Sequence, residues 1–288
     1  MANVHNYLLE FERSISLSAS KKKQLIASRK ALQQRVVDYF KAHARLLVPR
    51  FYIQGSYKMG TMVMDSEGTY DVDVGVYFLQ KPNIEPLSLQ KNVFNAVKGH
   101  TVSGLEHRDK CIRVVYKGDF DIDIPVYYKT PSDEHPYLAT KNGWMESDPK
   151  ELCDWFDAKK DRNGQLVRLV KYFKSWANNQ TGKMPSGIAF TVWIANNFRP
   201  DSRDDKAFFA TAKSIESEFG GGFRNTVAMN PVTPKDNLLK LDFDQRSNFK
   251  SVFRQMLKAI EKALSTKSTK KAATIWAELF GEKFPVNT

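Results

Sequence analysis

Two carboxylates alternate with apolar residues on one predicted strand. Residues 70–77 read Tyr-Asp-Val-Asp-Val-Gly-Val-Tyr. Successive side chains of a strand point to opposite faces, so the valines share one face and Asp71 and Asp73 share the other. Two carboxylates on one face repel each other unless a cation lies between them, and oxygen ligands of this kind suit Mg²⁺. The pattern therefore predicts a magnesium-binding strand with Asp71 and Asp73 as ligands.

A Gly-Ser turn lies just before this strand. Gly55 lets the backbone approach an anion without an intervening side chain, and Ser56 offers a hydroxyl and a backbone N–H. We expect both residues to bind a phosphate group, with help from the adjacent Gln54. The alternative for Gln54 is that it only ends a strand.

A second acidic strand follows at residues 119–128. Asp119, Asp121 and Asp123 have the same parity, so all three point to one face. Three carboxylates are the usual number that holds a pair of magnesium ions, which activate a hydroxyl and neutralise a leaving pyrophosphate. A phosphate-binding turn beside such strands indicates nucleotidyl transfer. The pattern alone leaves open which aspartate of the second strand is the third ligand.

The order of these motifs resembles the DNA polymerase β-like nucleotidyltransferase superfamily, and later segments narrow the resemblance. Residues 169–176, 184–187 and 230–238 look like helical-domain landmarks of the bacterial CD-NTases, relatives of cyclic GMP-AMP synthase and oligoadenylate synthetase. The resemblance runs from about residue 20 to about residue 265. It implies that Asp123 is the third catalytic and metal-binding carboxylate, with Asp121 as the alternative. It also implies that Lys171 and Ser186 contact the triphosphate.

The family resemblance implies an enzyme that joins nucleoside triphosphates into a cyclic oligonucleotide. It would use two Mg²⁺ ions, for which Mn²⁺ substitutes, and its product would switch on a downstream effector in antiphage defence. One alternative is a nucleotidyltransferase that modifies an RNA, a protein or a small molecule with the same metal site. Another is a nucleic-acid-binding protein on a degenerate fold, against which the intact Asp71, Asp73 and Asp123 argue.

Composition limits the remaining possibilities. The net charge of +12 over 288 residues suits polyanionic substrates and leaves a nucleic-acid activator open. The sequence lacks a Cys/His cluster of the kind that forms a DNA-binding insert in the animal DNA sensor of this family, so double-stranded DNA is a less favoured activator. Cys111 and Cys153 are far apart, which argues against structural zinc and a disulfide framework. With no signal peptide and no apolar segment long enough to span a bilayer, we expect a cytoplasmic protein without membrane contact.

The predicted elements give an α+β, two-lobed nucleotidyltransferase. Residues 1–145 are expected to form the catalytic lobe, with a mixed sheet and a long bracing helix over residues 19–47. Residues 146–288 are expected to form an α-helical lobe that closes the nucleotide cleft. Residues 130–144 are rich in Pro, Ser, Asn and Asp and predict a loop. Ser147-Asp148-Pro149 then predicts a helix start, because a capping residue precedes Pro in the first turn.

Overall fold

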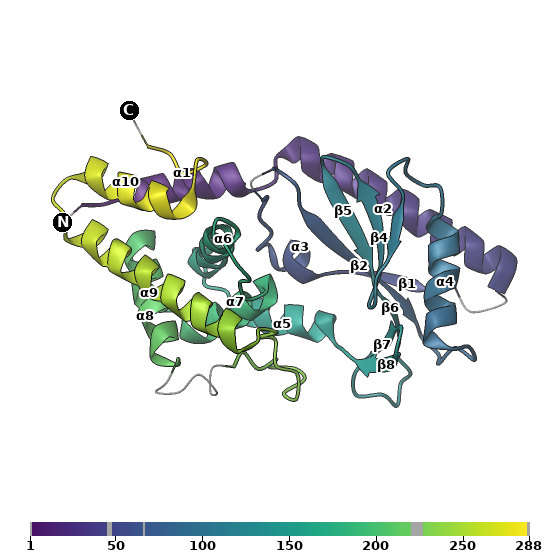
Figure 1. Cartoon of the computed structure of the whole chain (residues 1–288). Coiled ribbons are helices and arrows are strands. Elements are labelled where there is room, and N and C mark those ends of the chain that lie inside the picture. Colours follow the sequence, from purple (N-terminus) through teal and green to yellow (C-terminus); the bar gives the residue numbers. More distant parts are fainter. Residues whose placement is uncertain (1, 45–47, 66, 220–226, 287–288) are drawn as a thin grey trace. The chain divides into compact units, whose positions relative to one another are not determined.

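A computed structural model of the chain describes residues 2–44, 48–65, 67–219 and 227–286. The chain divides into two compact units (Figure 1). One comprises residues 17–60 and 67–154 and contains the sheet. The other comprises residues 1–16, 61–66 and 155–288 and is helical. This mixed α/β, two-lobed architecture confirms the predicted fold class.

The sheet unit is organised around β2, Asp71–Phe78. The strand order is β3-β4-β5-β2-β6-β7-β8, and β1 pairs with β2 outside this path. The pairs β2–β5 and β2–β6 are parallel, and the other pairs are antiparallel, so the sheet is mixed as expected. The other strands are β1 (Arg50–Gln54), β3 (Leu105–His107), β4 (Ile112–Tyr116), β5 (Phe120–Ile124), β6 (Val126–Tyr128), β7 (Tyr137–Thr140) and β8 (Gly143–Glu146).

Pro125 divides the predicted acidic strand of residues 119–128 into β5 and β6. Both segments pair with β2, one beside Asp71–Asp73 and the other beside Val76–Phe78. Proline cannot donate a ladder hydrogen bond, which accounts for the break at this position. The carbonyl of Pro125 still accepts a hydrogen bond from the N–H of Val76, at 2.9 Å. The interruption therefore leaves β2 as the continuous centre of the sheet.

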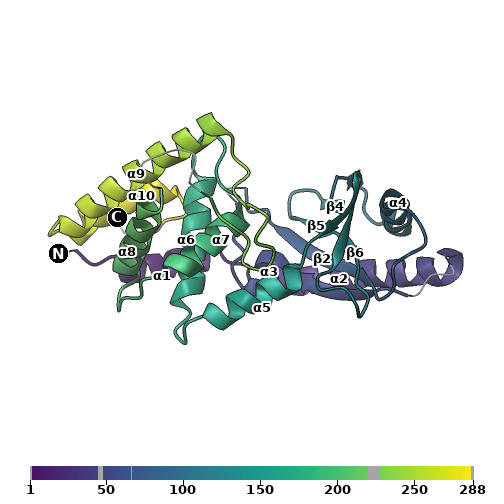
Figure 2. The same ribbon diagram turned by 90° about the horizontal axis from the view of Figure 1, so that it is seen from below.

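The two faces of β2 differ as the alternation predicts. Val72, Val74 and Val76 are buried on the face that carries helices α2 (Ala19–Tyr39) and α4 (Pro86–Val97). These two helices also pack against each other, and Figure 2 shows them beside the strands. Burial of the valine face fixes the strand register, because a slip by one residue would bury the aspartates instead.

Two predicted elements differ from the structure. Much of the loop predicted for residues 130–144 instead belongs to the β7–β8 hairpin, in which Thr140 pairs with Gly143 across the turn at Lys141-Asn142. The long helix predicted for residues 19–47 ends as an α-helix at Tyr39 and continues as a π-helical turn, Phe40–Ala44. Residues 45–47 lie outside the described residues. The strand β3 was also not anticipated, since it is only three residues long.

The helical unit consists mainly of α-helices, as expected for the second lobe. Its core is rich in aromatic side chains, among which Phe173 stacks on Phe208 with ring centroids 4.0 Å apart. Asp148 accepts a hydrogen bond from the N–H of Glu151, as expected for the cap of α5. The helices are α5 (Pro149–Lys159), whose first residues belong to the sheet unit, α6 (Gln165–Asn178), α7 (Gly187–Asn197), α8 (Asp204–Ser217), α9 (Phe243–Ser265) and α10 (Thr269–Phe280).

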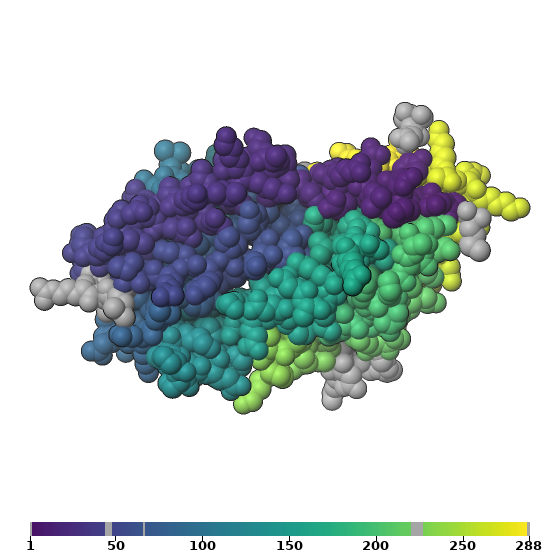
Figure 3. Space-filling model, turned by 180° about the vertical axis from the view of Figure 1, so that it is seen from behind, coloured from purple at the N-terminus to yellow at the C-terminus, as the bar shows by residue number. Residues whose placement is uncertain are grey.

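The N-terminal helix α1, His5–Ile15, belongs to the helical unit. Its buried Phe11 packs edge-to-face on Phe280 at 5.2 Å and also contacts Phe284, so the two ends of the chain lie side by side (Figure 3). The expected boundary at residue 145/146 had assigned this segment to the sheet lobe. Burial of an apolar helix face against α6, α8 and α10 accounts for the difference. Within the described ranges, no helix combines the length and apolar character that crossing a bilayer requires.

Candidate active site

The sheet register brings the predicted carboxylates together. In the parallel pair β2–β5, Asp71 lies opposite Asp121 and Asp73 lies opposite Asp123. All four side chains have the parity of the face opposite the valines. The side chains of Asp71, Asp121 and Asp123 are 58%, 25% and 14% exposed, so solvent reaches the cluster mainly from the side of Asp71.

An arginine that the sequence reasoning missed lies within this cluster. The Arg113 guanidinium donates to both carboxylate oxygens of Asp123 at 2.7 Å, to Asp121 at 2.8 Å, and lies 3.0 Å from Asp71. The sequence does contain a pattern that predicts the position of Arg113. The turn at Gly118, where φ is +78°, lies midway between positions 113 and 123, and an antiparallel hairpin about that turn places Arg113 opposite Asp123. Arg113 therefore places one positive charge among three of these carboxylates.

The electrostatics of the cluster favour a cation. Burial raises the pKa of Asp71 above its ordinary value, Arg113 opposes this rise, and the neighbouring charges of Asp123 and Asp121 add to it. Burial alone would lower the pKa of Arg113, but hydrogen bonds and charges from Asp123 and Asp71 raise it. Close carboxylates repel, and a positive charge between them relieves the repulsion.

Gly55 packs directly against one of the carboxylates. Its φ is +66°, a conformation that favours glycine, and a Cβ at this position would lie 2.1 Å from Oδ2 of Asp73. Gly55 begins the short helix α3, Gly55–Met59, directly after β1. The turn predicted to bind phosphate is thereby held against the aspartate face of β2, with half-buried Ser56 as its second residue.

The side chain of Gln54 is engaged elsewhere. It is buried, its Nε2 donates to the Tyr127 hydroxyl at 3.0 Å, and its Oε1 accepts from the Tyr77 hydroxyl at 3.1 Å. Gly75 leaves room for this amide, since a Cβ there would lie 2.6 Å from Oε1 of Gln54. Gln54 therefore holds two tyrosine hydroxyls on the face of β2 that carries the aspartates, a role that sequence reasoning did not consider.

The donor set fits a hard divalent cation. Asp71, Asp73 and Asp123 supply oxygen atoms only, which suits Mg²⁺ rather than softer metals. Burial and the charge of Asp123 raise the pKa of the nearby Cys111 thiol to about 12, so a protonated thiol lies beside the carboxylates. The Arg113 guanidinium bonds both oxygens of Asp123, so a metal ion bound there would compete with these contacts. The residues present therefore fit the metal that the family resemblance implies.

The structure gives Lys171 an acidic partner within the helical unit. Its Nζ lies 2.5 Å from Glu12 of α1 and 3.0 Å from the Ser16 hydroxyl, and its side chain is only 12% exposed. Burial alone would raise the pKa of Glu12, but the hydrogen bond and charge of Lys171 hold it below its ordinary value. Lys171 is therefore not a solvated side chain, and any contact with a triphosphate requires it to exchange this partner.

Ser186 occupies the position expected of it at the start of a helix. Its side chain accepts from the N–H of Ala189 and caps α7, and the residue is exposed. Below this turn lies Lys174, whose Nζ contacts both the carbonyl and the hydroxyl of Thr61. A Cβ on Gly187 would lie 3.1 Å from Cε of Lys174, so this buried lysine packs closely beneath the helix start. The sequence reasoning had not singled out Lys174.

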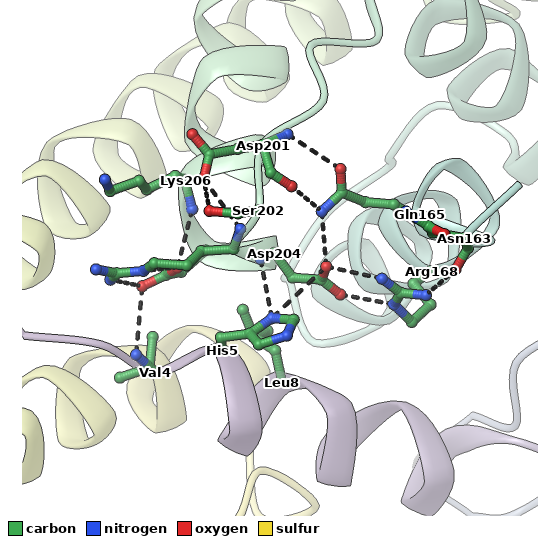
Figure 4. A network of polar contacts seen from close by, with 12 residues as sticks. Val4, His5, Leu8, Asn163, Gln165, Arg168, Asp201, Ser202, Asp204 and Lys206 are labelled. Carbon is green, nitrogen blue, oxygen red and sulfur yellow. Dashed lines mark hydrogen bonds and ion pairs between the residues drawn. The ribbon is translucent and has the colours of Figure 1, made fainter. Parts of the chain in front are cut away.

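Arg168, also on α6, belongs to a structural network. It donates to both oxygens of the fully buried Asp204, which also accepts from Gln165 (Figure 4). The hydroxyl of Tyr172 donates to Asp204 as well. The N–H of Asp204 donates to the imidazole of His5 at 3.0 Å. These contacts join α1, α6 and α8. Arg168 thus helps to hold the helical unit together.

Three comparisons with known proteins agree with this description. The sequence profile described as "Cyclic GMP-AMP synthase DncV-like, nucleotidyltransferase domain" matches residues 49–127, which include the Gly-Ser turn and all the clustered carboxylates. A cyclic GMP-AMP synthase of Escherichia albertii is 30% identical over 249 residues, covering 80% of this chain and 53% of that protein. A cyclic AMP-AMP-AMP synthase of Acinetobacter is 23% identical, covering 81% and 72%.

Solved structures share the fold. Vibrio cholerae DncV in complex with nonhydrolyzable GTP has a TM-score of 0.85 at 20% identity, covering 99% of this chain and 97% of that one. The Bradyrhizobium diazoefficiens CD-NTase CdnG in complex with GTP has a TM-score of 0.77 at 14% identity, covering 94% and 97%. The fold and the matched domain define a nucleotidyltransferase-type protein. Residues 49–127 match the family of DncV-like nucleotidyltransferase domains, and the chain spans about half the length of its Escherichia albertii relative.

Proposed function

We propose that this chain is a metal-dependent nucleotidyltransferase that condenses nucleoside triphosphates into a cyclic oligonucleotide and releases pyrophosphate. The observation that carries the proposal is the register of β2 and β5, which aligns Asp71 and Asp73 with Asp121 and Asp123 on the face to which Gly55 is packed. The relatives named as synthases of cyclic GMP-AMP, c-di-GMP and cyclic AMP-AMP-AMP support the product class.

Asp71, Asp73 and Asp123 would hold the catalytic metal. Asp123 is preferred to Asp121 because it lies opposite Asp73, the carboxylate against which Gly55 packs, and is the less exposed of the two. When bound, two Mg²⁺ ions, or Mn²⁺ in their place, neutralise phosphate charge and lower the pKa of an attacking hydroxyl.

The remaining residues would position the triphosphate. Gly55 admits the phosphate close to the backbone, and the Ser56 hydroxyl donates to a phosphate oxygen. The resemblance supports Lys171 and Ser186 as further contacts, with Lys171 exchanging its bond to Glu12 for a phosphate oxygen. Gln54 would act indirectly, since its amide is bonded to buried tyrosines.

Incubation with each labelled triphosphate and Mg²⁺, followed by phosphatase and chromatography, tests this proposal. Phosphatase-resistant oligonucleotides formed without an acceptor are the expected result. Label found only in an added RNA, protein or small molecule would favour acceptor modification. We further propose that the product signals to an effector in antiphage defence, which a phage-plaque assay with Asp71→Asn as the inactive control would test.

A further inference from the structure

A second cluster of metal-ligating side chains lies in the sheet unit, outside the aspartate face. His135 precedes β7, Asp148 caps α5, and Glu151 lies in the first turn of that helix. Nδ1 of His135 lies 3.6 Å from Oδ2 of Asp148 and 3.4 Å from Oε2 of Glu151. One donor atom from each residue falls within 4.8 Å of the other two.

The contacts of His135 are unusual for an ordinary ion pair. Its Nδ1 atom is buried and has no hydrogen-bond partner among the described residues. Both carboxylate oxygens lie beyond normal N–H···O distances of about 2.7–3.2 Å. A buried polar atom without a partner costs free energy, and such atoms commonly indicate a water or an ion. The imidazole is nevertheless held in place, since its side chain is only 15% exposed.

The separations match those of ligands that share one metal ion. Ligands about 2.0–2.1 Å from a tetrahedral Zn²⁺ lie roughly 3.3–3.4 Å from one another. The two His135 distances of 3.4 and 3.6 Å are close to this value. Asp148 can serve the helix and a metal together, because Oδ1 accepts the Glu151 N–H while Oδ2 is the oxygen that faces His135.

We propose that His135, Asp148 and Glu151 bind a zinc-class divalent transition metal ion. A histidine nitrogen with two carboxylates favours Zn²⁺ over Mg²⁺, which distinguishes this site from the all-carboxylate cluster of β2 and β5. The ion would tie the segment before β7 to the start of α5. Asp148 and Glu151 also line a cavity of about 570 Å³ beside Tyr52 and Tyr77, so the ion would have a path of entry and a fourth position open to a small ligand.

The test is Zn²⁺ binding by calorimetry, with Co²⁺ absorption as a spectroscopic check, in excess Mg²⁺ to saturate the other cluster. We expect one saturable site in the parent chain. His135→Gln should weaken its affinity by about a hundredfold or more, because loss of supporting residues around a metal site already costs 10–100-fold. Glu151→Gln should weaken it about tenfold; this side chain is 56% exposed, so the variant is expected to fold normally.

Two controls locate the effect. His43→Gln removes an exposed histidine that bonds to the carbonyl of Tyr39, and this variant should bind Zn²⁺ like the parent. The double variant Asp71→Asn, Asp73→Asn should also keep the site. Absence of saturable Zn²⁺ binding in the parent, or parent-like affinity in both His135→Gln and Glu151→Gln, would overturn the proposal. So would loss of binding in the Asp71, Asp73 variant alone, which would assign the zinc to the aspartate face.

Discussion

Replacing Arg113 by methionine should destabilise the sheet unit, because it removes the positive charge from among three carboxylates while keeping an apolar stem of similar size. Arg113 is 11% exposed and Asp123 14%, so their bidentate contact counts as largely buried. Breaking a buried pair by removing one partner costs about 3–5 kcal/mol. The contact between Arg113 and Asp71 adds little to the stability, because Asp71 is 58% exposed. We therefore expect a loss at the lower end of this range, about 3 kcal/mol.

The assay is thermal and urea unfolding with and without Mg²⁺. A loss of about 3 kcal/mol corresponds to a fall in Tm of roughly 6–12 °C for a domain of this size. Added Mg²⁺ should raise the Tm of Arg113→Met more than that of the parent, because the guanidinium no longer competes for the carboxylate oxygens and ligand binding stabilises by mass action.

A matched control lies directly after the neighbouring strand β3. Arg108 pairs with Glu106 at 2.7 Å, but both side chains are about half exposed, so Arg108→Met should change stability by no more than about 0.5 kcal/mol. The reasoning fails if Arg113→Met is as stable as Arg108→Met. It fails equally if Mg²⁺ raises the Tm of the parent and of Arg113→Met by the same amount.

Three further variants test individual contacts. Lys171→Ala leaves its half-buried acidic partner unpaired and should cost about 1–3 kcal/mol in urea unfolding; weaker triphosphate binding with unchanged stability would contradict this. Burial alone would raise the pKa of Asp204, but hydrogen bonds from its partners hold it below its ordinary value. A carboxylate of this kind stabilises the fold above its unfolded pKa of about 4, and the stabilisation is lost as pH falls further. Asp204→Asn should therefore be less stable at neutral pH and show a shallower loss of stability below about pH 4; an acid unfolding profile parallel to that of the parent would refute the assignment. Gly55→Ala should lower both the stability of the protein and its Mg²⁺ affinity. Gly68→Ala also adds a Cβ at a positive φ, +80°, but no described atom lies within 4 Å of that Cβ, so this variant should lose stability alone. Equal Mg²⁺ affinities in the two variants would show that the close approach of Gly55 to Asp73 does not matter.

The sequence predicts the central strands of the sheet better than it predicts the β7–β8 hairpin and helix α1. Alternating valine and aspartate determine which face of β2 is buried, and the shared parity of Asp121 and Asp123 places them on the other face. The β7–β8 hairpin was missed because the polar residues before it resemble a loop, although Asn142-Gly143 is a strong hairpin signal. The helix α1 was missed as well, although Leu8, Phe11 and Ile15 have the apolar spacing of three and four residues that is typical of a helix.

Contacts between distant segments explain the remaining differences. Lys171 and Glu12 are 159 residues apart, and nothing in the local pattern of α6 shows that α1 supplies its acidic partner. The amide of Gln54 is satisfied by tyrosines on two other strands, again a tertiary arrangement. Arg113 differs, because the hairpin geometry about Gly118 was sufficient to place it opposite Asp123.

The most direct test of the central claim is product formation from nucleoside triphosphates alone. Purified chain, Mg²⁺ and labelled triphosphates should yield phosphatase-resistant oligonucleotides, and Asp71→Asn with Asp73→Asn should yield none while remaining folded. Asp123→Asn should be equally inactive, whereas Asp121→Asn should retain activity. Undiminished product from the Asp71, Asp73 double variant would contradict the proposed catalytic role of this carboxylate cluster.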